Sequence, residues 1–306
     1  HYMLFKKTSL LFLIIFFAVT INAQTVNIDS LQFIVKFNPD NLEKVNAYKA
    51  LSMALIFKDF DECQAMASDG ARLAEKLKDI KSLSRLKLTT GLSWYFKGSY
   101  DSAAVYYYKA LDLLKNENSP EARAGVLNEL GKLYRKTKDL DRALQMYDEA
   151  YALYKKENDE NGMATILNES GVVFEYKGDY TEAIKRYKSS LAIREKMNDQ
   201  VGIGYSYNFL GGVYTIQKNF TQAEINLLKS LEIRRQLKDS FSIALSHGDL
   251  GYMYKEQGKF DKAAEQYNLS NAIAASMNYA DLMLSNYREL AVIAEKKGDY
   301  AASLGY

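Results

Sequence analysis

Cysteine, proline and histidine are all scarce in this chain of 306 residues. The single cysteine, Cys63, excludes a disulfide framework and every metal site built from several thiolates. Two histidines, one of them at position 1, leave little for zinc ligation or a proton relay. Two prolines favour long, uninterrupted helices. We therefore expect a helical protein that binds rather than catalyses, with no catalytic residues, no metal ligands and no cofactor.

The first 23 residues have the pattern of a secretory signal peptide. Lys6 and Lys7 precede an apolar run from Leu10 to Val19, and Asn22-Ala23 ends the segment with a small residue. The apolar run is shorter than the roughly 20 residues that cross a bilayer. We expect His1 and Tyr2, which precede Met3, to be non-native. The sequence therefore predicts export to the periplasm, as a free protein or one anchored in the membrane by a segment beyond this chain.

Removal of residues 1–23 lowers the formal net charge from +2 to zero, because Lys6 and Lys7 are the charged residues of that segment. A neutral chain has no electrostatic reason to bind nucleic acid or anionic lipid. We therefore expect a protein or peptide partner and no nucleic acid.

Internal repeats of 40 residues dominate the rest of the chain. The repeating glycines are Gly91, Gly131, Gly171, Gly211 and Gly251. An aromatic residue follows each glycine after three positions, alanine after 12, a tyrosine or leucine after 16, and a small residue after 19. Steps of three and four residues stack side chains on one face of a helix. Each repeat therefore predicts a hairpin of two helices, A and B, whose backbones approach closely at the glycine and the alanine.

The turn between helices A and B has its own pattern. Glycine, as at Gly178, permits the left-handed conformation that ends a helix. The polar residues just beyond the turn are expected to cap helix B. These expected caps are Asp141, Thr181, Thr221 and Asp261.

This pattern of glycine, aromatic and alanine columns resembles the tetratricopeptide repeat. The period of 40 and the lack of proline at the end of helix B are similar to the repeats of kinesin light chains and bacterial peptide-sensing regulators. The resemblance implies an all-α, right-handed solenoid over residues 42–306, with six complete hairpins and a seventh that stops within helix B. Residues 24–41 then form an N-terminal segment. A solenoid needs a cap on its last unit, so we expect the natural protein to continue beyond Tyr306.

A looser resemblance concerns the order of the parts. A secretion signal followed by 40-residue repeats is similar to the extracytoplasmic sensor regions of Bacteroidetes membrane signalling proteins. This implies a peptide-sensing region whose output domain, for example a histidine kinase, follows the repeats. The alternative is a free-standing periplasmic scaffold that assembles other proteins. An apolar segment of about 20 residues after Tyr306 would favour the receptor, and a capping helix the scaffold.

Few residues suggest chemistry. His247 and Cys63 fall in packing columns and are expected in the core. Gly202-Ile203-Gly204 follows no predicted strand, which excludes a phosphate loop. The carboxylates are expected to be solvated charges on exposed faces.

Asparagine recurs three residues before the repeat glycine in three successive units. The resemblance implies that this position of helix A faces the concave inner surface, where an amide can pair with the backbone of a bound peptide. The alternative is that asparagine merely suits a solvated helix face. The inner-surface candidates are Asn128, Asn168, Asn208, Lys132, Arg135, Tyr205 and Tyr252, with Arg85, Thr215 and Lys255 on the same stripe.

Overall fold

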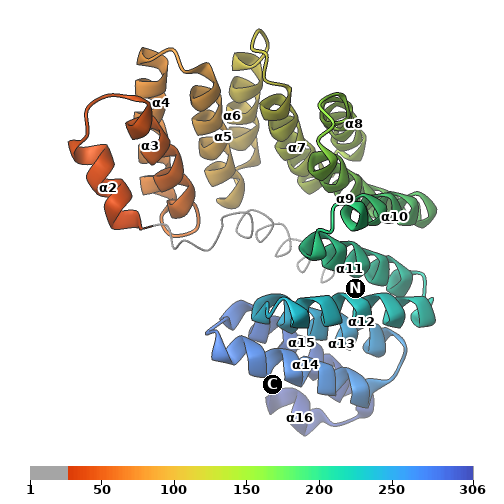
Figure 1. The fold of residues 1–306 in the computed structure, drawn as a ribbon. Coiled ribbons are helices and arrows are strands. Elements are labelled where there is room, and N and C mark those ends of the chain that lie inside the picture. Colours follow the sequence, from red (N-terminus) through yellow and green to blue (C-terminus); the bar gives the residue numbers. More distant parts are fainter. Residues whose placement is uncertain (1–26, 306) are drawn as a thin grey trace. The chain divides into compact units, whose positions relative to one another are not determined.

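The computed structural model describes residues 27–305, and these residues form α-helices joined by short turns (Figure 1). The chain divides into two compact units, one up to Asn118 and one from Ser119 on. The helices of the N-terminal unit are α2 (Ile28–Phe37), α3 (Leu42–Leu55), α4 (Phe60–Lys76), α5 (Ile80–Phe96) and α6 (Tyr100–Leu113). Those of the C-terminal unit are α7 (Pro120–Thr137), α8 (Leu140–Lys156), α9 (Glu160–Lys177), α10 (Tyr180–Lys196), α11 (Gln200–Ile216), α12 (Phe220–Gln236), α13 (Ser240–Glu256), α14 (Phe260–Ser276), α15 (Ala280–Lys297) and α16 (Tyr300–Gly305).

Within each unit every helix packs against the next one along the chain. The predicted all-α fold of consecutive helical hairpins is therefore confirmed for the described residues, which contain no strand. Helix α2 lies in the predicted N-terminal segment, and α3 begins at Leu42, where the first hairpin is expected. The predicted signal peptide lies outside the described residues, and the predicted domain boundaries remain predictions.

The A helices of the C-terminal unit (α7, α9, α11, α13 and α15) also contact one another directly. The backbones of the B helices between them (α8, α10, α12 and α14) do not approach one another in this way in the part of the chain that the structure describes, although Arg186 on α10 reaches Asp148 on α8 at 3.9 Å. The A helices are therefore the more closely spaced row, and they form the inner side of this stack.

The repeat glycines allow this close packing. A Cβ atom added at Gly171 would lie 2.5 Å from Cε1 of Tyr187, the residue 16 positions later on helix B. Gly131 has the same relation to Tyr147. Both tyrosines are fully buried. The predicted close approach is confirmed, although the nearest neighbour of Gly171 is the ring of Tyr187 rather than Ala183.

The turns confirm one prediction and correct another. Gly178 ends α9 with φ +79°, in the left-handed region, as expected of a turn glycine. The predicted caps at Asp141, Thr181, Thr221 and Asp261 are wrong, because the B helices begin two residues earlier than expected. The capping side chains are instead Asp139, Asp179 and Asn219, each of which accepts a hydrogen bond from a backbone N–H in the first turn.

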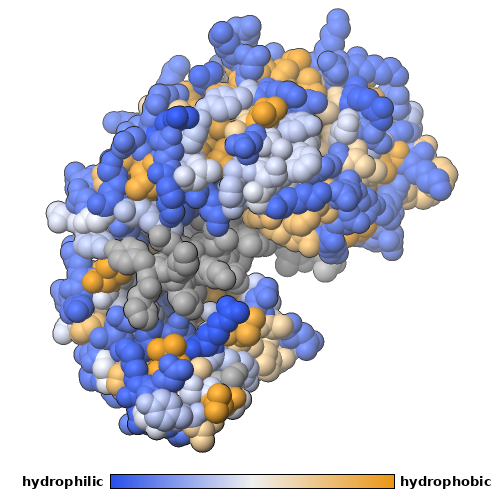
Figure 2. Space-filling view, turned by 180° about the vertical axis from the view of Figure 1, so that it is seen from behind, coloured by the Kyte–Doolittle hydropathy of each residue, from blue (hydrophilic) through white to orange (hydrophobic). Residues whose placement is uncertain are grey.

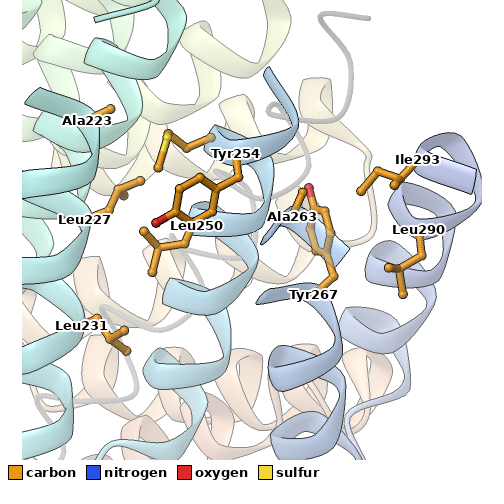
Figure 3. Close-up of a cluster of buried hydrophobic side chains, with 10 residues drawn as sticks. Ala223, Leu227, Leu231, Leu250, Tyr254, Ala263, Tyr267, Leu290 and Ile293 are labelled. Carbon is orange, nitrogen blue, oxygen red and sulfur yellow. The ribbon is translucent and has the colours of Figure 1, made fainter. Parts of the chain in front are cut away.

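The core runs between the two rows of helices. In the C-terminal unit, side chains of α12, α13, α14 and α15 meet in one cluster that includes Leu227, Leu250, Tyr254, Tyr267 and Leu290 (Figure 3). Most of the surface seen in Figure 2 is hydrophilic, with hydrophobic residues in small, separate areas. The repeat columns thus place most apolar residues between helices and leave most charged residues outside.

The glycine packing gives a matched pair of predictions. Gly171→Ala should lower the free energy of unfolding by about 1–3 kcal/mol, because the new methyl group would overlap the buried ring of Tyr187. Gly125→Ala, in the interior of α7, meets no atom within 4 Å and should raise it by about 0.5–1 kcal/mol through helix propensity. Urea denaturation of both variants checks this, and equal effects would contradict the proposed packing.

Candidate functional site

The candidate site is a stripe along the inner side of the A helices. On each helix it contains the residues three before, one after and four after the repeat glycine, which share a face because they are four and seven residues apart. We call this set the inner stripe. Its members are Asn128, Lys132 and Arg135 on α7; Asn168, Val172 and Glu175 on α9; Asn208, Gly212 and Thr215 on α11; and Gly248, Tyr252 and Lys255 on α13.

The two predicted cations of α7 are buried in ion pairs. Lys132 Nζ lies 2.8 Å from Glu129 Oε1, and Arg135 Nη2 lies 3.2 Å from Glu169 Oε2 on α9. Lys132 is 7% exposed and Arg135 is 5% exposed. Sequence reasoning placed both among the inner-surface binding candidates, but the structure leaves little of either side chain accessible to a ligand. Crowding between the A helices buries these charges, and each is stabilised by a neighbouring carboxylate.

The expectation that the carboxylates are solvated is wrong for the A helices. Glu129 and Glu289 are buried, and Glu169, Glu175 and Asp249 are half-buried. A signal for four of them was present in the sequence. The position two residues before the repeat glycine is acidic in four repeats, and α11, with Phe209, interrupts the series.

The ion pairs follow a regular spacing between successive A helices. Arg135 on α7 pairs with Glu169 on α9, and Lys255 on α13 pairs with Glu289 on α15 at 2.6 Å. The partners of both pairs are 34 residues apart in sequence. In both pairs the basic residue lies four positions after the glycine of its own repeat. The glutamate lies two positions before the glycine position of the next repeat, which is Gly171 or Ala291.

The three asparagines differ in their surroundings. Asn168 is 7% exposed, and its Oδ1 accepts no hydrogen bond. Asn128 is half-buried, and its Oδ1 also lacks a donor, although its Nδ2 lies 3.5 Å from Glu129 Oε1. Asn208 is half-buried and accepts a hydrogen bond from Arg234 Nη1 at 3.2 Å. The view of Asn168 as a solvated, exposed position is therefore wrong.

Asn208 belongs to a buried polar network around Arg234 of α12. Arg234 is 3% exposed and donates to the Ser242 carbonyl at 3.2 Å and to Ser246 Oγ at 2.5 Å, both on α13. Burial raises the pKa of the nearby Asp249 carboxyl to about 6, although Arg234 and a hydrogen bond from Asn208 act to lower it. This network ties α11, α12 and α13 together.

The two predicted tyrosines also differ. Tyr205 is 5% exposed, and the Arg234 guanidinium lies 5.4 Å from its ring centre. Tyr252 is half-buried, with Lys255 Nζ 4.8 Å from its ring centre. The prediction that Tyr205 belongs to an accessible binding surface is therefore wrong, because the side chain packs into the Arg234 network.

Glu175 on α9 is a half-buried carboxyl that sequence reasoning missed. It accepts a hydrogen bond of 2.7 Å from the Tyr187 hydroxyl. Burial raises the pKa of Glu175 to about 7, and the Tyr187 hydrogen bond and Arg135 oppose that rise. A group with this pKa changes its charge near neutral pH.

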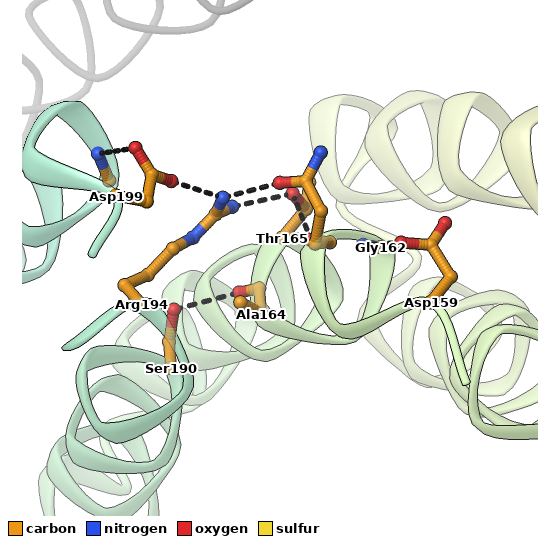
Figure 4. Close-up of polar contacts among 9 residues, drawn as sticks. Asp159, Gly162, Ala164, Thr165, Ser190, Arg194 and Asp199 are labelled. Atoms are coloured by element: carbon orange, nitrogen blue, oxygen red, sulfur yellow. Dashed lines mark hydrogen bonds and ion pairs between the residues drawn. The ribbon is translucent and has the colours of Figure 1, made fainter. Parts of the chain in front are cut away.

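A second buried arginine, Arg194 of α10, has a structural role (Figure 4). It is 2% exposed, pairs with Asp199 at 2.6 Å, and donates to Asn161 and to Thr165 Oγ1. In the same region Ser190 Oγ donates to the Ala164 carbonyl at 2.8 Å. These contacts join α9 and α10 to the residue that caps α11.

The residues that could suggest catalysis lie in the core. His247 is 5% exposed, and its Nδ1 lies 2.8 Å from Oε1 of Gln266. Burial lowers the pKa of its imidazole. Cys63 is fully buried, and burial raises the pKa of its thiol to about 11, which opposes thiolate formation. Both core assignments are confirmed. Among residues 27–305 no group of histidine, cysteine and acidic residues could hold a metal ion. None of the helices described is both long and apolar enough to span a bilayer.

Comparison with known proteins supports the repeat assignment. A family model described as tetratricopeptide repeat matches residues 122–196 and 203–276. No curated protein sequence matches the chain significantly.

Solved structures share the fold at low sequence identity. BtubC from P. vanneervenii is 22% identical with a TM-score of 0.64, over 72% of this chain and 93% of that protein. Aspartyl phosphate phosphatase F from Bacillus subtilis is 14% identical with a TM-score of 0.66, and the match covers 91% of this chain and 72% of that protein. A Rap protein in complex with Competence and Sporulation Factor is 18% identical with a TM-score of 0.61, and the match covers 87% of this chain and 74% of that protein.

The unequal asparagines give a testable contrast. Asn168→Ala should leave the free energy of unfolding unchanged or raise it by up to about 1 kcal/mol. The substitution removes a buried acceptor that has no donor, and alanine has the higher helix propensity. Asn208→Ala should lower the free energy of unfolding by about 1–3 kcal/mol, because Arg234 loses a buried acceptor. Chemical denaturation measures both, and a similar loss in the two variants would contradict the assignment.

Glu175 predicts a pH effect on stability. Its folded-state pKa of about 7 lies above the ordinary value of 4.5, so the folded protein binds more protons between these values. The stabilisation from the protonated form is therefore lost as the pH rises from 4.5 to about 7. Glu175→Gln can still accept from Tyr187 and should raise the free energy of unfolding above pH 7 by about 1–3 kcal/mol, with little change near pH 4.5. A pH-independent difference from wild type in urea titrations would show this assignment to be wrong.

Proposed function

We propose that this tetratricopeptide repeat protein binds an extended peptide or protein segment along the inner stripe of its C-terminal unit. The observation that carries the proposal is the pair of side-chain acceptors on neighbouring A helices, Asn128 Oδ1 and Asn168 Oδ1, that are buried without a hydrogen-bond donor. A buried acceptor without a donor costs about 1–3 kcal/mol. Rotation of each asparagine side chain toward the inner surface would let a peptide N–H reach the oxygen and remove that cost. Asn208, which serves the Arg234 network, is not part of this binding pair.

The solved structures are consistent with a binding role. One of the Rap proteins with this fold was solved in complex with Competence and Sporulation Factor. The fold itself is generally a non-catalytic scaffold, and the histidine and cysteine of the described chain are buried in the core. Binding therefore accounts for the A-helix side chains better than catalysis does.

The proposal extends to the setting of the protein. The signal-peptide pattern of residues 1–23 supports export, and the order of signal and repeats supports a ligand-sensing region of a membrane signalling protein. A free-standing periplasmic scaffold is the second candidate. Mass spectrometry of protein expressed in a Gram-negative host tests export: a mature N-terminus at Gln24 in the periplasm supports it, and an intact N-terminus on cytoplasmic protein opposes it.

The binding proposal is tested with a displayed library of linear peptides. Peptides selected on the wild-type protein are synthesised and titrated by calorimetry. The double variant Asn128→Ala/Asn168→Ala should weaken their binding at least roughly tenfold, because each backbone N–H loses its acceptor. Asn268→Ala, at an exposed position of α14, is the matched control and should leave the affinity unchanged. Equal affinities for wild type and the double variant would reject the proposed contact.

A further inference from the structure

The junctions between successive A helices of the C-terminal unit differ in their charges. Arg135 pairs with Glu169 between α7 and α9, and Lys255 pairs with Glu289 between α13 and α15. Between α11 and α13 the equivalent position is Thr215, whose hydroxyl donates to the Gly211 carbonyl, and Arg234 of α12 supplies the cation near Asp249. Three of these four junctions therefore contain a basic side chain near a carboxylate.

The junction between α9 and α11 reverses this arrangement. The position that holds Arg135 on α7 and Lys255 on α13 holds Glu175 on α9, and the position that it would face on α11 holds Phe209. The buried arginine of this repeat, Arg194, is engaged by Asp199. Arg135 is the cation that acts on Glu175, and it is already paired with Glu169. Two carboxylates thus share one guanidinium, which leaves a surplus negative charge when Glu175 is ionised.

The surroundings of Glu175 suit a cationic side chain. The rings of Tyr187 and Phe209 are stacked, with centroids 5.1 Å apart and planes inclined by 14°, and the Tyr187 hydroxyl reaches Glu175. Phe209 and Glu175 are both half-buried, so part of each remains accessible. Tyr187 is fully buried between Gly171 and Phe209, so Phe209 is the ring of this pair that a ligand could contact. A carboxylate beside an aromatic ring combines an ion pair with cation–π attraction, which suits both ammonium and guanidinium groups.

Asn168 links this charge to the proposed binding surface. It lies seven residues before Glu175, on the same face of α9 and about 10 Å away along the helix axis. Its Oδ1 is the buried acceptor without a donor described above. An extended peptide whose backbone N–H meets Asn168 can therefore reach Glu175 with the side chain of a neighbouring residue.

We propose that the inner stripe selects basic peptides, with a lysine or arginine side chain of the ligand bound by Glu175 beside the half-buried ring of Phe209. This inference rests on the proposed peptide-binding function and names its ligand class. Lys132 and Arg135, the basic candidates from the sequence, take no part in this selection because both are held in internal ion pairs.

The test uses three synthetic peptides of equal length, in which alanine alternates with lysine, serine or glutamate. Fluorescence anisotropy at about pH 8, where Glu175 is ionised, should show tightest binding for the lysine peptide and weakest for the glutamate peptide. Glu175→Gln should weaken the lysine peptide roughly tenfold and leave the serine peptide unchanged. Glu157→Gln removes the same charge from an exposed position at the end of α8 and should change the lysine peptide less than twofold.

The outcomes separate this inference from the function on which it rests. Equal binding of the lysine and serine peptides, an unchanged preference in Glu175→Gln, or an equal loss in Glu157→Gln would overturn the basic selectivity. If the serine peptide still binds and Asn128→Ala/Asn168→Ala weakens it, the peptide-binding function stands without this selectivity. If none of the three peptides binds, the inference fails, and the library selection decides the function independently. Circular dichroism of each variant verifies that it is folded.

Discussion

The contact between a repeat glycine on helix A and a large side chain on helix B sets the spacing within the hairpins of the C-terminal unit. At Gly131 and Gly171 no Cβ atom fits, so the tyrosine ring packs directly against the backbone of the partner helix. The contact recurs between Gly251 and Tyr267 and, with a leucine in place of the ring, between Gly211 and Leu227. Hairpins of similar geometry can stack in one regular arrangement. The spacing of the A helices follows from that stacking, and so does the crowding of polar side chains between them.

This crowding decides which groups remain for a partner. A charge between closely spaced helices must find an opposite charge or a hydrogen bond, because an isolated buried charge is strongly destabilising. Lys132, Arg135 and Lys255 meet that need with glutamates of their own or the next A helix. The groups that the proposal assigns to a partner are the amide oxygens of Asn128 and Asn168 and the Glu175 carboxyl, none of which is held in an internal ion pair in the described residues. In this proposal, internal pairing rather than the number of charges in the sequence determines the recognition surface.

The fold could be predicted from the sequence because its signals are local and recur every 40 residues. The glycine, aromatic and alanine columns each report one contact inside a hairpin, and repetition makes each of them visible. Cap positions were misplaced by two residues because the start of helix B depends on the conformation of the turn, as at Asp139 and Asp179. The signal peptide lies outside the described residues, and its prediction stands on sequence alone.

The site was less predictable because its contacts join different hairpins. The pairing of Arg135 with Glu169 spans 34 residues, and neither residue type alone indicates burial. The acidic residues two positions before the repeat glycine in most units would have suggested it. The distinction between Asn168 and Asn208 has no such signal, because it depends on Arg234, a residue of the following helix.

The buried arginines at the ends of α10 and α12 have a consequence for how the stack comes apart. Arg234 bonds to residues of α11 and α13, so α13 cannot detach without leaving a buried guanidinium short of acceptors. Arg194 bonds in the same way to residues of α9 and to Asp199, which caps α11. Neighbouring hairpins joined by a buried arginine should therefore open together. The hairpins from α9 to α14 are then expected to unfold as a single cooperative block.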